Sequence, residues 1–267
     1  DDLQATYFLS CNRHKESISL DLKSDDGVAV LRDLVRRADV LVENFRPGVL
    51  DRLGFSPAQL HELNPRLVIL SISGFGHDGP EATRSGYDQI VQGEAGLMSL
   101  TGSGPEDPQR VGVPIADLLS GMYGAFGLLA ALLERERTGK GQVVRTSLLA
   151  AVVGVHAFQG TRHTVAGEVP AAQGNHHPSI APYGLFSCRG GKVQISVGSE
   201  KLWETFAATF GIDTSRPEFA GNAQRVRNRS AVIEAVEEAF AEYDAEPLLE
   251  KLRAAGIPAG KVRTLDE

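Results

Sequence analysis

The segment 66–73, which reads RLVILSIS, is the feature that most constrains the fold of this chain. Its apolar residues do not alternate with polar ones, which is typical of a strand that is buried on both faces. Strands of this kind occur in parallel sheets that helices cover on both sides. The segment therefore predicts an α/β domain built on an open parallel sheet.

Strand and helix signals alternate along the first half of the chain, as an α/β domain requires. The period-two pattern of residues 17–22 predicts a strand, and Ser24 is a favourable cap for the helix that follows. Residues 40–42 predict a short buried strand. The pair Ser56-Pro57 predicts the start of a further helix, because proline is well tolerated at the first helical position.

The second half of the chain predicts a smaller domain. Residues 1–150 are assigned to the large domain, and residues 151–178 are interpreted as a linker, since the stretch 160–178 is rich in Gly, Pro, Ala and His and lacks periodicity. Two strand-like segments then flank Arg189-Gly190-Gly191, which is a hairpin signal. With the helical patterns that follow, residues 179–267 predict a small α+β domain.

The composition excludes several classes of protein. A length of 267 residues with 42% hydrophobic residues allows a large core, and a net charge of −7 without a basic cluster argues against nucleic-acid binding. No run of eighteen apolar residues is present, so no membrane span is expected. Cys11 and Cys188 lie far apart, which favours a reducing compartment, and a cytoplasmic protein is expected. The start at Asp1 has no leader pattern and suggests that residues precede it.

Asp117 lies where a long apolar helix is predicted to begin. Apolar residues recur at helical spacing from Leu118 to Leu133, and Gly139 supplies a left-handed residue to end the helix. A carboxylate near the first turn accepts hydrogen bonds from free N–H groups, which stabilise its charged form. On these residues alone Asp117 is either a structural cap, the commoner role, or a catalytic carboxylate.

Glycines are unusually frequent around the first turns of this helix, at Gly112, Gly121, Gly124 and Gly127. Each glycine inside a helix costs about 1 kcal/mol relative to alanine. We therefore expect another element or a ligand to approach the helix closely there.

The loops after the predicted strands carry candidate ligand contacts. Asn44, Phe45, Arg46 and Arg52 follow the strand at 40–42, and open α/β sheets bind ligands at the carboxyl ends of their strands. An aromatic ring, an amide and guanidinium groups are suited to stacking and to phosphate pairing. A nucleotide-like ligand and a solvated loop with a buried phenylalanine both fit these residues.

Metal and cofactor motifs are missing from the sequence. No Cys/His set has the spacing of a metal site, and no P-loop or dinucleotide fingerprint occurs. His176 and His177 are adjacent, but no third ligand is near them in the sequence. We predict no metal, and interpret the two histidines as part of a polar loop or as substrate contacts.

Several strings, taken in order, resemble the family III CoA-transferases, also called the CaiB/BaiF family. They are FLSCNR at 8–13, SISLDLK at 17–23, VENFRPG at 42–48, LGF at 53–55, GYD at 86–88, VPIADLLSG at 113–121, TGKGQ at 138–142 and GIPAG at 256–260. The resemblance implies a Rossmann-like large domain, a small domain, and an interlocked homodimer whose active site lies where domains meet. It also implies that an N-terminal βαβ unit and a C-terminal return to the large domain are absent here.

The resemblance also implies the chemistry. The catalytic aspartate of the family falls on Asp117, which would accept acyl and CoA groups as an anhydride and a thioester while CoA passes from an acyl-CoA to a carboxylic acid. Coenzyme A is then a co-substrate, and no permanently bound cofactor is expected. The positions that resemble CoA contacts are Leu20, Lys23, Asn44, Phe45, Arg52, Arg84 and Tyr87, and the positions of the substrate loop are Asn175, His176 and His177.

The substrate is constrained only in class. The loop 174–183 lacks the run of glycines found in oxalate-using members and is closer to members that act on succinyl-CoA and dicarboxylates. A racemase branch of the family has a histidine where this chain has Tyr87, and tyrosine, with a pKa of about 10, is a poor proton shuttle at neutral pH. Transfer is therefore favoured over 2-methylacyl-CoA racemisation, and a non-catalytic CoA-binding subunit is the remaining alternative.

Overall fold

The computed structural model describes residues 5–267, which form two compact units. Unit 1 contains the residues up to 97 together with 111–161, and unit 2 contains residues 98–110 and 162–267. The division at Thr161 lies within the stretch 151–178 that the sequence predicts as a linker. Part of that stretch is helical, because residues 157–166 form a helix.

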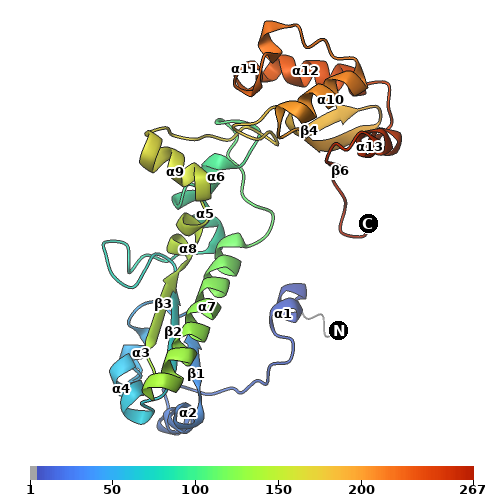
Figure 1. The fold of residues 1–267 in the computed structure, drawn as a ribbon. Coiled ribbons are helices and arrows are strands. Elements are labelled where there is room, and N and C mark those ends of the chain that lie inside the picture. Colours follow the sequence, from blue (N-terminus) through green and yellow to red (C-terminus); the bar gives the residue numbers. More distant parts are fainter. Residues whose placement is uncertain (1–4) are drawn as a thin grey trace. The chain divides into compact units, whose positions relative to one another are not determined.

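Unit 1 is built on a parallel sheet of three strands, in the order β1 (Val40–Glu43), β2 (Val68–Ser73) and β3 (Val143–Ser147) (Figure 1). The register pairs Glu43 with Ser71, and Ser71 with Arg145. The first three residues of the central strand β2 are buried. The prediction of a parallel sheet around a strand buried on both faces is thus confirmed.

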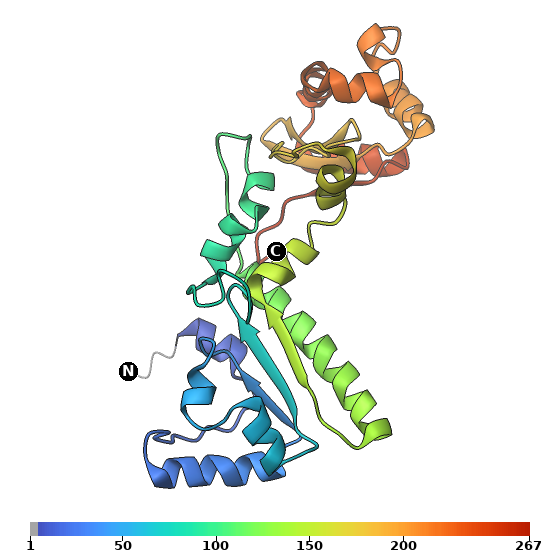
Figure 2. The same ribbon diagram turned by 90° about the vertical axis from the view of Figure 1, so that its left-hand side faces the viewer.

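Helices cover both faces of this sheet. The chain up to residue 166 contains the helices α1 (Thr6–Cys11), α2 (Asp25–Arg37), α3 (Val49–Arg52), α4 (Pro57–Leu63), α5 (Asp88–Glu94), α6 (Leu97–Leu100), α7 (Ile115–Thr138), α8 (Leu148–Gly154) and α9 (Ala157–Ala166), and not all of them contact the sheet. Figure 2 shows α2 and α4 on one side of the strands and α7 on the other. Ile69 packs against Val35 of α2 and Leu60 of α4 in one core cluster.

Serine caps start two of these helices as the sequence predicts. The Ser24 hydroxyl accepts a hydrogen bond from the N–H of Gly27, and Ser56 forms a capping box with Gln59 at the start of α4. Each cap satisfies a backbone N–H that the helix itself leaves unpaired.

Two glycines let α7 approach the sheet closely. A Cβ at Gly124 would lie 2.8 Å from Leu70 Cδ2, and a Cβ at Gly127 would lie 2.5 Å from Val144 Cγ1. A Cβ at Gly121 would have nothing within 4 Å. The expectation of a close approach is confirmed at Gly124 and Gly127, whereas Gly121 faces open space.

In the described part of the chain, α7 is the one helix long and apolar enough to cross a bilayer by length and composition. The core helix of a soluble protein passes the same test, and α7 packs on β2, β3 and α8. It also exposes a row of apolar side chains, namely Leu118, Met122, Phe126, Leu129 and Leu133.

The strand predicted at residues 17–22 is wrong. These residues have no regular secondary structure, and Ile18 is 64% exposed. A period-two pattern describes which side chains would share a face, but a strand also needs a neighbour for its backbone. Within residues 5–267 the sheets contain no strand that pairs with this segment.

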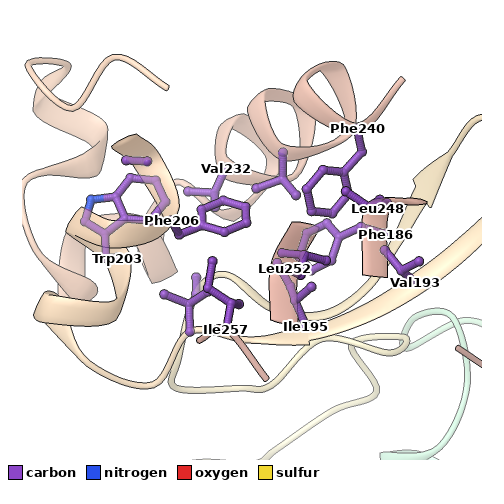
Figure 3. Close-up of a cluster of buried hydrophobic side chains, with 14 of the residues drawn as sticks. Phe186, Val193, Ile195, Trp203, Phe206, Val232, Phe240, Leu248, Leu252 and Ile257 are labelled. Carbon is purple, nitrogen blue, oxygen red and sulfur yellow. The ribbon is translucent and has the colours of Figure 1, made fainter. Parts of the chain in front are cut away.

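Unit 2 contains an antiparallel sheet in the order β4 (Tyr183–Cys188), β5 (Gly191–Ser196) and β6 (Ala259–Lys261). Its helices are α10 (Glu200–Phe210), the 3-10 turn η1 (Pro217–Phe219), α11 (Asn222–Arg227), α12 (Arg229–Phe240) and α13 (Ala245–Ala254). Figure 3 shows the core between them, in which Phe186 and Ile195 of the sheet lie among the side chains of Phe206 and Phe240. The predicted hairpin is confirmed, and β6 is a strand that the sequence did not reveal.

Candidate active site

A hollow of about 560 Å³ opens beside the carboxyl ends of β1 and β2 in unit 1. Its walls come from the loop after β1, the loop after β2, the segment before α5 and the first turns of α7. Five of the predicted site residues line it together, namely Asn44, Phe45, Arg84, Tyr87 and Asp117. Open α/β sheets bind ligands at the carboxyl ends of their strands, and the hollow lies at this position.

Three predicted CoA contacts do not line this hollow. Leu20 and Lys23 precede α2, and Arg52 is the last residue of α3. The guanidinium of Arg52 lies near Gly48, where an added Cβ would be 3.3 Å from Nη1. The roles of these three residues as CoA contacts stay predictions.

Asp117 is the third residue of α7 and does not cap it. The residue at the N-cap position is Pro114, which offers no side-chain cap. The cap comes from Asp88 of α5, whose Oδ1 accepts hydrogen bonds from the N–H of Ala116 at 2.7 Å and of Asp117 at 3.4 Å. The interpretation of Asp117 as the cap is therefore wrong, and these two N–H groups are already used rather than free to bind a reacting oxygen.

The electrostatic setting of Asp117 also differs from the sequence expectation. Desolvation raises the pKa of the Asp117 carboxyl, and the nearby negative charge of Asp88 raises it further. The expected stabilisation of the charged form by the helix end is therefore outweighed. A carboxylate with a raised pKa is more basic and is a better nucleophile in its ionised form.

Asp88 is held in place by further hydrogen bonds. Its Oδ2 accepts one from Gln92 Nε2 at 2.7 Å, and Gln92 Oε1 accepts one from the N–H of Val111 at 2.9 Å. Gln92 is fully buried. The chain of bonds ties the segment before α7 to α5, and so fixes where α7 begins.

Aromatic and polar groups surround the opening. The rings of Phe45 and Tyr87 are 47% and 75% exposed, which leaves their faces available for stacking. Asn44 is oriented by a hydrogen bond from its Nδ2 to the carbonyl oxygen of Ile72 at 2.7 Å. The guanidinium of Arg84 pairs with Glu94 and lies 4.6 Å from the ring centroid of Phe75, so its orientation is set by unit 1 itself.

Tyr7 of α1 is a neighbour of this site that the sequence did not single out. Desolvation raises the pKa of its phenol, and the negative charge of Asp117 is the next cause. The ring is exposed. No spacing rule connects Tyr7 with Asp117, because the two residues are 110 positions apart and interact electrostatically only through the fold.

The predicted substrate loop lies in unit 2. The ring of His177 stacks on Tyr183 with centroids 4.9 Å apart, and the ring of His176 meets the edge of Phe186 at 5.2 Å. Burial lowers the pKa of both histidines, and the positive charge of Arg229 lowers it further. Both rings are therefore neutral whenever the pH is above a pKa that is itself lower than that of an ordinary histidine.

Among residues 5–267, no three side chains of His, Cys, Asp or Glu are grouped as metal ligands. The ring of His177 is stacked on Tyr183, and the ring of His176 makes a T-shaped contact with Phe186.

An open parallel sheet with a carboxylate-lined hollow beside its strand ends defines a ligand-binding α/β protein. The family is defined by sequence: residues 2–267 match the family model of CoA-transferase family III, and the chain belongs to this family. The resemblance seen in the sequence motifs is thus confirmed, and family membership identifies the chain as a CoA-transferase.

Curated relatives support this assignment. The acetyl-CoA:oxalate CoA-transferase of Acetobacter aceti is 38% identical over 267 residues, which cover 99% of this chain and 69% of that protein. The succinate–glutarate CoA-transferase of Agrobacterium fabrum is 35% identical and is covered to 67% of its length. The human succinyl-CoA:glutarate CoA-transferase is 31% identical and is covered to 60%. The chain therefore spans about two thirds of the length of these relatives.

A solved structure shows the same fold. The crystal structure of a CaiB/BaiF family protein from Brucella suis superposes with a TM-score of 0.87 at 39% identity, over 98% of this chain and 70% of that one. The mixed α/β architecture with its parallel sheet is thus the architecture of the family.

Proposed function

We propose that this CoA-transferase moves CoA from an acyl-CoA to a dicarboxylic acid, with Asp117 as the nucleophile. The observation that carries the proposal is the position of Asp117 on a hollow at the strand ends, between exposed aromatic rings and beside the open face of Gly121. The dicarboxylate class is supported by the names of the relatives, which act on oxalate, glutarate and mesaconate.

The proposed reaction proceeds in four displacements. An oxygen of the Asp117 carboxylate attacks the acyl-CoA carbonyl, the C–S bond breaks, and a mixed anhydride and CoA thiolate result. The thiolate attacks the aspartyl carbonyl, which releases the donor acid and leaves an aspartyl-CoA thioester. The acceptor carboxylate then expels the thiolate and forms a second anhydride. Attack of the thiolate on the acceptor acyl carbon gives the new acyl-CoA and restores Asp117.

The surroundings of Asp117 suit these steps. Its pKa is raised by desolvation and by Asp88, so the ionised carboxylate is a stronger nucleophile than an ordinary one. Gly121 leaves space next to it for a pantetheine arm, because a Cβ there would contact nothing within 4 Å. Phe45 and Tyr87 offer ring faces to the adenine or the pantetheine.

Two kinds of dicarboxylate are candidates for the acceptor. The loop 174–183 lacks a glycine run and resembles that of family members which act on succinyl-CoA and dicarboxylates. The relative from Acetobacter aceti, at 38% identity, favours acetyl-CoA and oxalate. Both alternatives require the same chemistry at Asp117 and differ in the pocket for the acceptor.

The test is a screen on the full-length protein. Acetyl-CoA and succinyl-CoA are each incubated with oxalate, succinate, glutarate and mesaconate, and the new acyl-CoA is measured by mass spectrometry. We expect transfer in the wild type and none in Asp117→Asn, and hydroxylamine should modify Asp117 during turnover. Exchange of the α-proton of 2-methylacyl-CoA without transfer would establish the racemase instead, and CoA binding with neither reaction would establish a binding subunit.

The family resemblance also supports an interlocked homodimer as the assembly of the full-length protein. Light scattering on that protein distinguishes a dimer from a monomer. A dimer that stays associated on dilution to nanomolar concentration is the expected result, because linked chains separate only when they unfold.

A further inference from the structure

The loop at residues 177–181 in unit 2 is held by side chains rather than by its own backbone. Within unit 2, the N–H of His177 bonds to the carbonyl of Tyr183 at 2.9 Å. Four carbonyl groups of the loop, however, accept hydrogen bonds from three side chains of α11 and α12, namely Asn222, Arg225 and Arg229. A loop without secondary structure needs such partners, since buried backbone groups are costly when unpaired.

Arg229 holds the histidine end of the loop. Its Nη1 donates to the carbonyl oxygen of His177 at 2.6 Å, and its Nη2 donates to that of Pro178 at 3.1 Å. Within residues 5–267 it forms no ion pair with a carboxylate, and desolvation lowers the pKa of its guanidinium. The planar fork of this side chain is thus committed to two successive carbonyl groups, a geometry that lysine does not reproduce.

Asn222 and Arg225 hold the other end. The amide of Asn222 donates from Nδ2 to the carbonyl oxygen of Ser179 at 2.8 Å and accepts at Oδ1 from the N–H of Ala181 at 3.1 Å. Arg225 Nε donates to the carbonyl oxygen of Ala181 at 2.8 Å. Asn222 therefore uses both ends of its amide, one as donor and one as acceptor.

Arg225 is the fixed support of this arrangement. It is 1% exposed, it pairs with Glu200 at 2.9 Å, and its guanidinium lies 4.7 Å from the ring centroid of Trp203. A charge buried this deeply is tolerated only when it is paired and fully hydrogen-bonded. Replacing it would endanger the fold of unit 2, so Arg225 is no useful probe of the loop.

We propose that Asn222 and Arg229 are positioning residues which fix the loop so that Asn175, His176 and His177 present one arrangement to the acceptor acid. The proposal rests on the proposed function of CoA transfer. A loop with several conformations loses conformational entropy each time a ligand orders it. A preformed loop avoids this cost and binds its ligand more tightly. The KM of the acceptor acid should therefore depend on these residues. The KM of the acyl-CoA donor, whose predicted contacts lie in unit 1, should not.

Asn222→Asp is the sharpest variant. The new carboxylate keeps an acceptor for the N–H of Ala181 but loses the donor to Ser179, and places a negative oxygen against that carbonyl. An acidic residue at the first position of α11 suits the helix N-terminus, so the helix itself is not weakened. Gln224→Glu is the matched control, since it makes the same chemical change on α11 at a side chain that forms no hydrogen bond in the described structure.

Arg229→Lys is the second variant. It keeps the positive charge beside His176 and His177 but replaces the rigid planar fork of the guanidinium with a compact ammonium on a flexible stem, which holds the two carbonyl groups less firmly. Arg227→Lys is its control, because Arg227 is exposed on the neighbouring helix and forms no ion pair within residues 5–267. Any effect shared by both lysine variants would come from the change of residue type and not from the loop.

Two measurements on the full-length protein decide the proposal. In both variants, and in neither control, we expect the KM of the acceptor to rise roughly 10-fold or more while the KM of the acyl-CoA stays within about 2-fold. Hydrogen exchange should accelerate at the amides of residues 177–181 and stay unchanged in β4. Equal changes in both KM values, or unchanged exchange in the loop, would overturn the proposal.

The two measurements also separate this proposal from the proposed function. If the wild type transfers CoA to no acid, the function fails, while hydrogen exchange still shows whether Asn222 and Arg229 hold the loop. If exchange accelerates and the acceptor KM does not move, the three side chains are structural supports only, and the positioning role is refuted. A lowered melting temperature in Arg229→Lys alone leaves Asn222→Asp to decide.

Discussion

The carboxylate of Asp88 caps α7 and leaves the carboxylate of Asp117 free. Asp88 Oδ1 accepts a hydrogen bond from the N–H of Ala116 at 2.7 Å. A residue 29 positions before Asp117 thus provides the cap that Asp117 was expected to provide. This division of roles lets the Asp117 side chain line the hollow. It also sets a second negative charge nearby, which is one cause of the raised pKa of Asp117.

Replacing Asp88 by asparagine should shift the pH dependence of transfer. In the proposed mechanism the nucleophile is ionised Asp117, so activity should be lost as the pH falls through the pKa of this carboxyl in the folded state. Desolvation and the charge of Asp88 both raise that pKa, so Asp88→Asn removes the second cause and keeps the first. We expect the acidic limb of the kcat/KM profile to move to lower pH, measured between pH 4 and pH 8 in a constant ionic-strength buffer.

Asp88→Ala serves as the comparison for this effect. It removes the charge and also the acceptor for the N–H of Ala116, and losing a helix cap costs about 1 kcal/mol. Its melting temperature should therefore be lower than that of Asp88→Asn, with a similar shift of the acidic limb. An acidic limb that stays in place in both variants would show that Asp117 does not sense Asp88.

Asp117→Asn should make the protein more stable at neutral pH while it abolishes transfer. A carboxyl group whose pKa is raised on folding favours the folded state below its unfolded pKa of about 3.9, and this contribution is lost as the pH rises through the folded pKa. At pH 7 the desolvated charge of the Asp117 carboxylate destabilises the folded state, whereas a neutral asparagine does not. The melting temperature of the variant should exceed that of the wild type at pH 7, and the difference should vanish near pH 3. A variant that is less stable at pH 7 would contradict the raised pKa.

The sequence predicted the helix that carries Asp117 but did not reveal which residue caps it. The helical spacing from Leu118 onward and Gly139 predicted the helix and its end, and both are confirmed. The true cap was hidden, because Asp88 reaches α7 through a contact between segments far apart in the sequence. Local patterns predict local structure, whereas a cap donated by another helix depends on packing.

Gly121 and Gly124 should respond in opposite ways to alanine. A Cβ at Gly124 would lie 2.8 Å from Leu70, so Gly124→Ala forces α7 away from β2 and should cost about 1–3 kcal/mol, seen in urea unfolding. A Cβ at Gly121 meets nothing, and the added helix propensity is worth up to about 1 kcal/mol. Gly121→Ala should therefore preserve or raise stability.

The cost of Gly121→Ala should appear in catalysis instead. Gly121 lines the hollow beside Asp117, and a methyl group there narrows the space for the acyl-CoA. We expect the KM of the acyl-CoA to rise several-fold in Gly121→Ala, with a melting temperature equal to or above that of the wild type. Unchanged kinetics in a stable variant would show that the substrate does not pass over this face of α7.

The segment 17–22 and the loop 177–181 mark the limit of sequence reasoning. The first has a strand pattern without a partner strand in the described residues, so its periodicity was misleading. The second has no pattern at all, yet four side-chain atoms of Asn222 and Arg229 fix its course through hydrogen bonds that span 41 to 52 positions in the sequence. In both cases the deciding information is absent from the local sequence pattern.

Gly184→Ala should damage the predicted substrate loop without touching unit 1. A Cβ at this position in β4 would lie 2.5 Å from His176 Nδ1 and 2.6 Å from the carbonyl oxygen of Asn175, so the loop must move away. Displacing a substrate contact by about 1 Å can reduce activity on the order of 100-fold. We expect kcat/KM for the acceptor to fall strongly while the affinity for CoA, measured by calorimetry, stays the same.

Gly198→Ala is the matched control for this prediction, since a Cβ there would meet nothing within 4 Å and the residue also lies in unit 2. It should behave as the wild type in both measurements. If Gly184→Ala weakens CoA binding as much as acceptor turnover, the variant has disturbed more than the loop. If instead it leaves acceptor turnover intact, then His176 and Asn175 do not contact the acceptor, because the one change that must displace both of them has no effect.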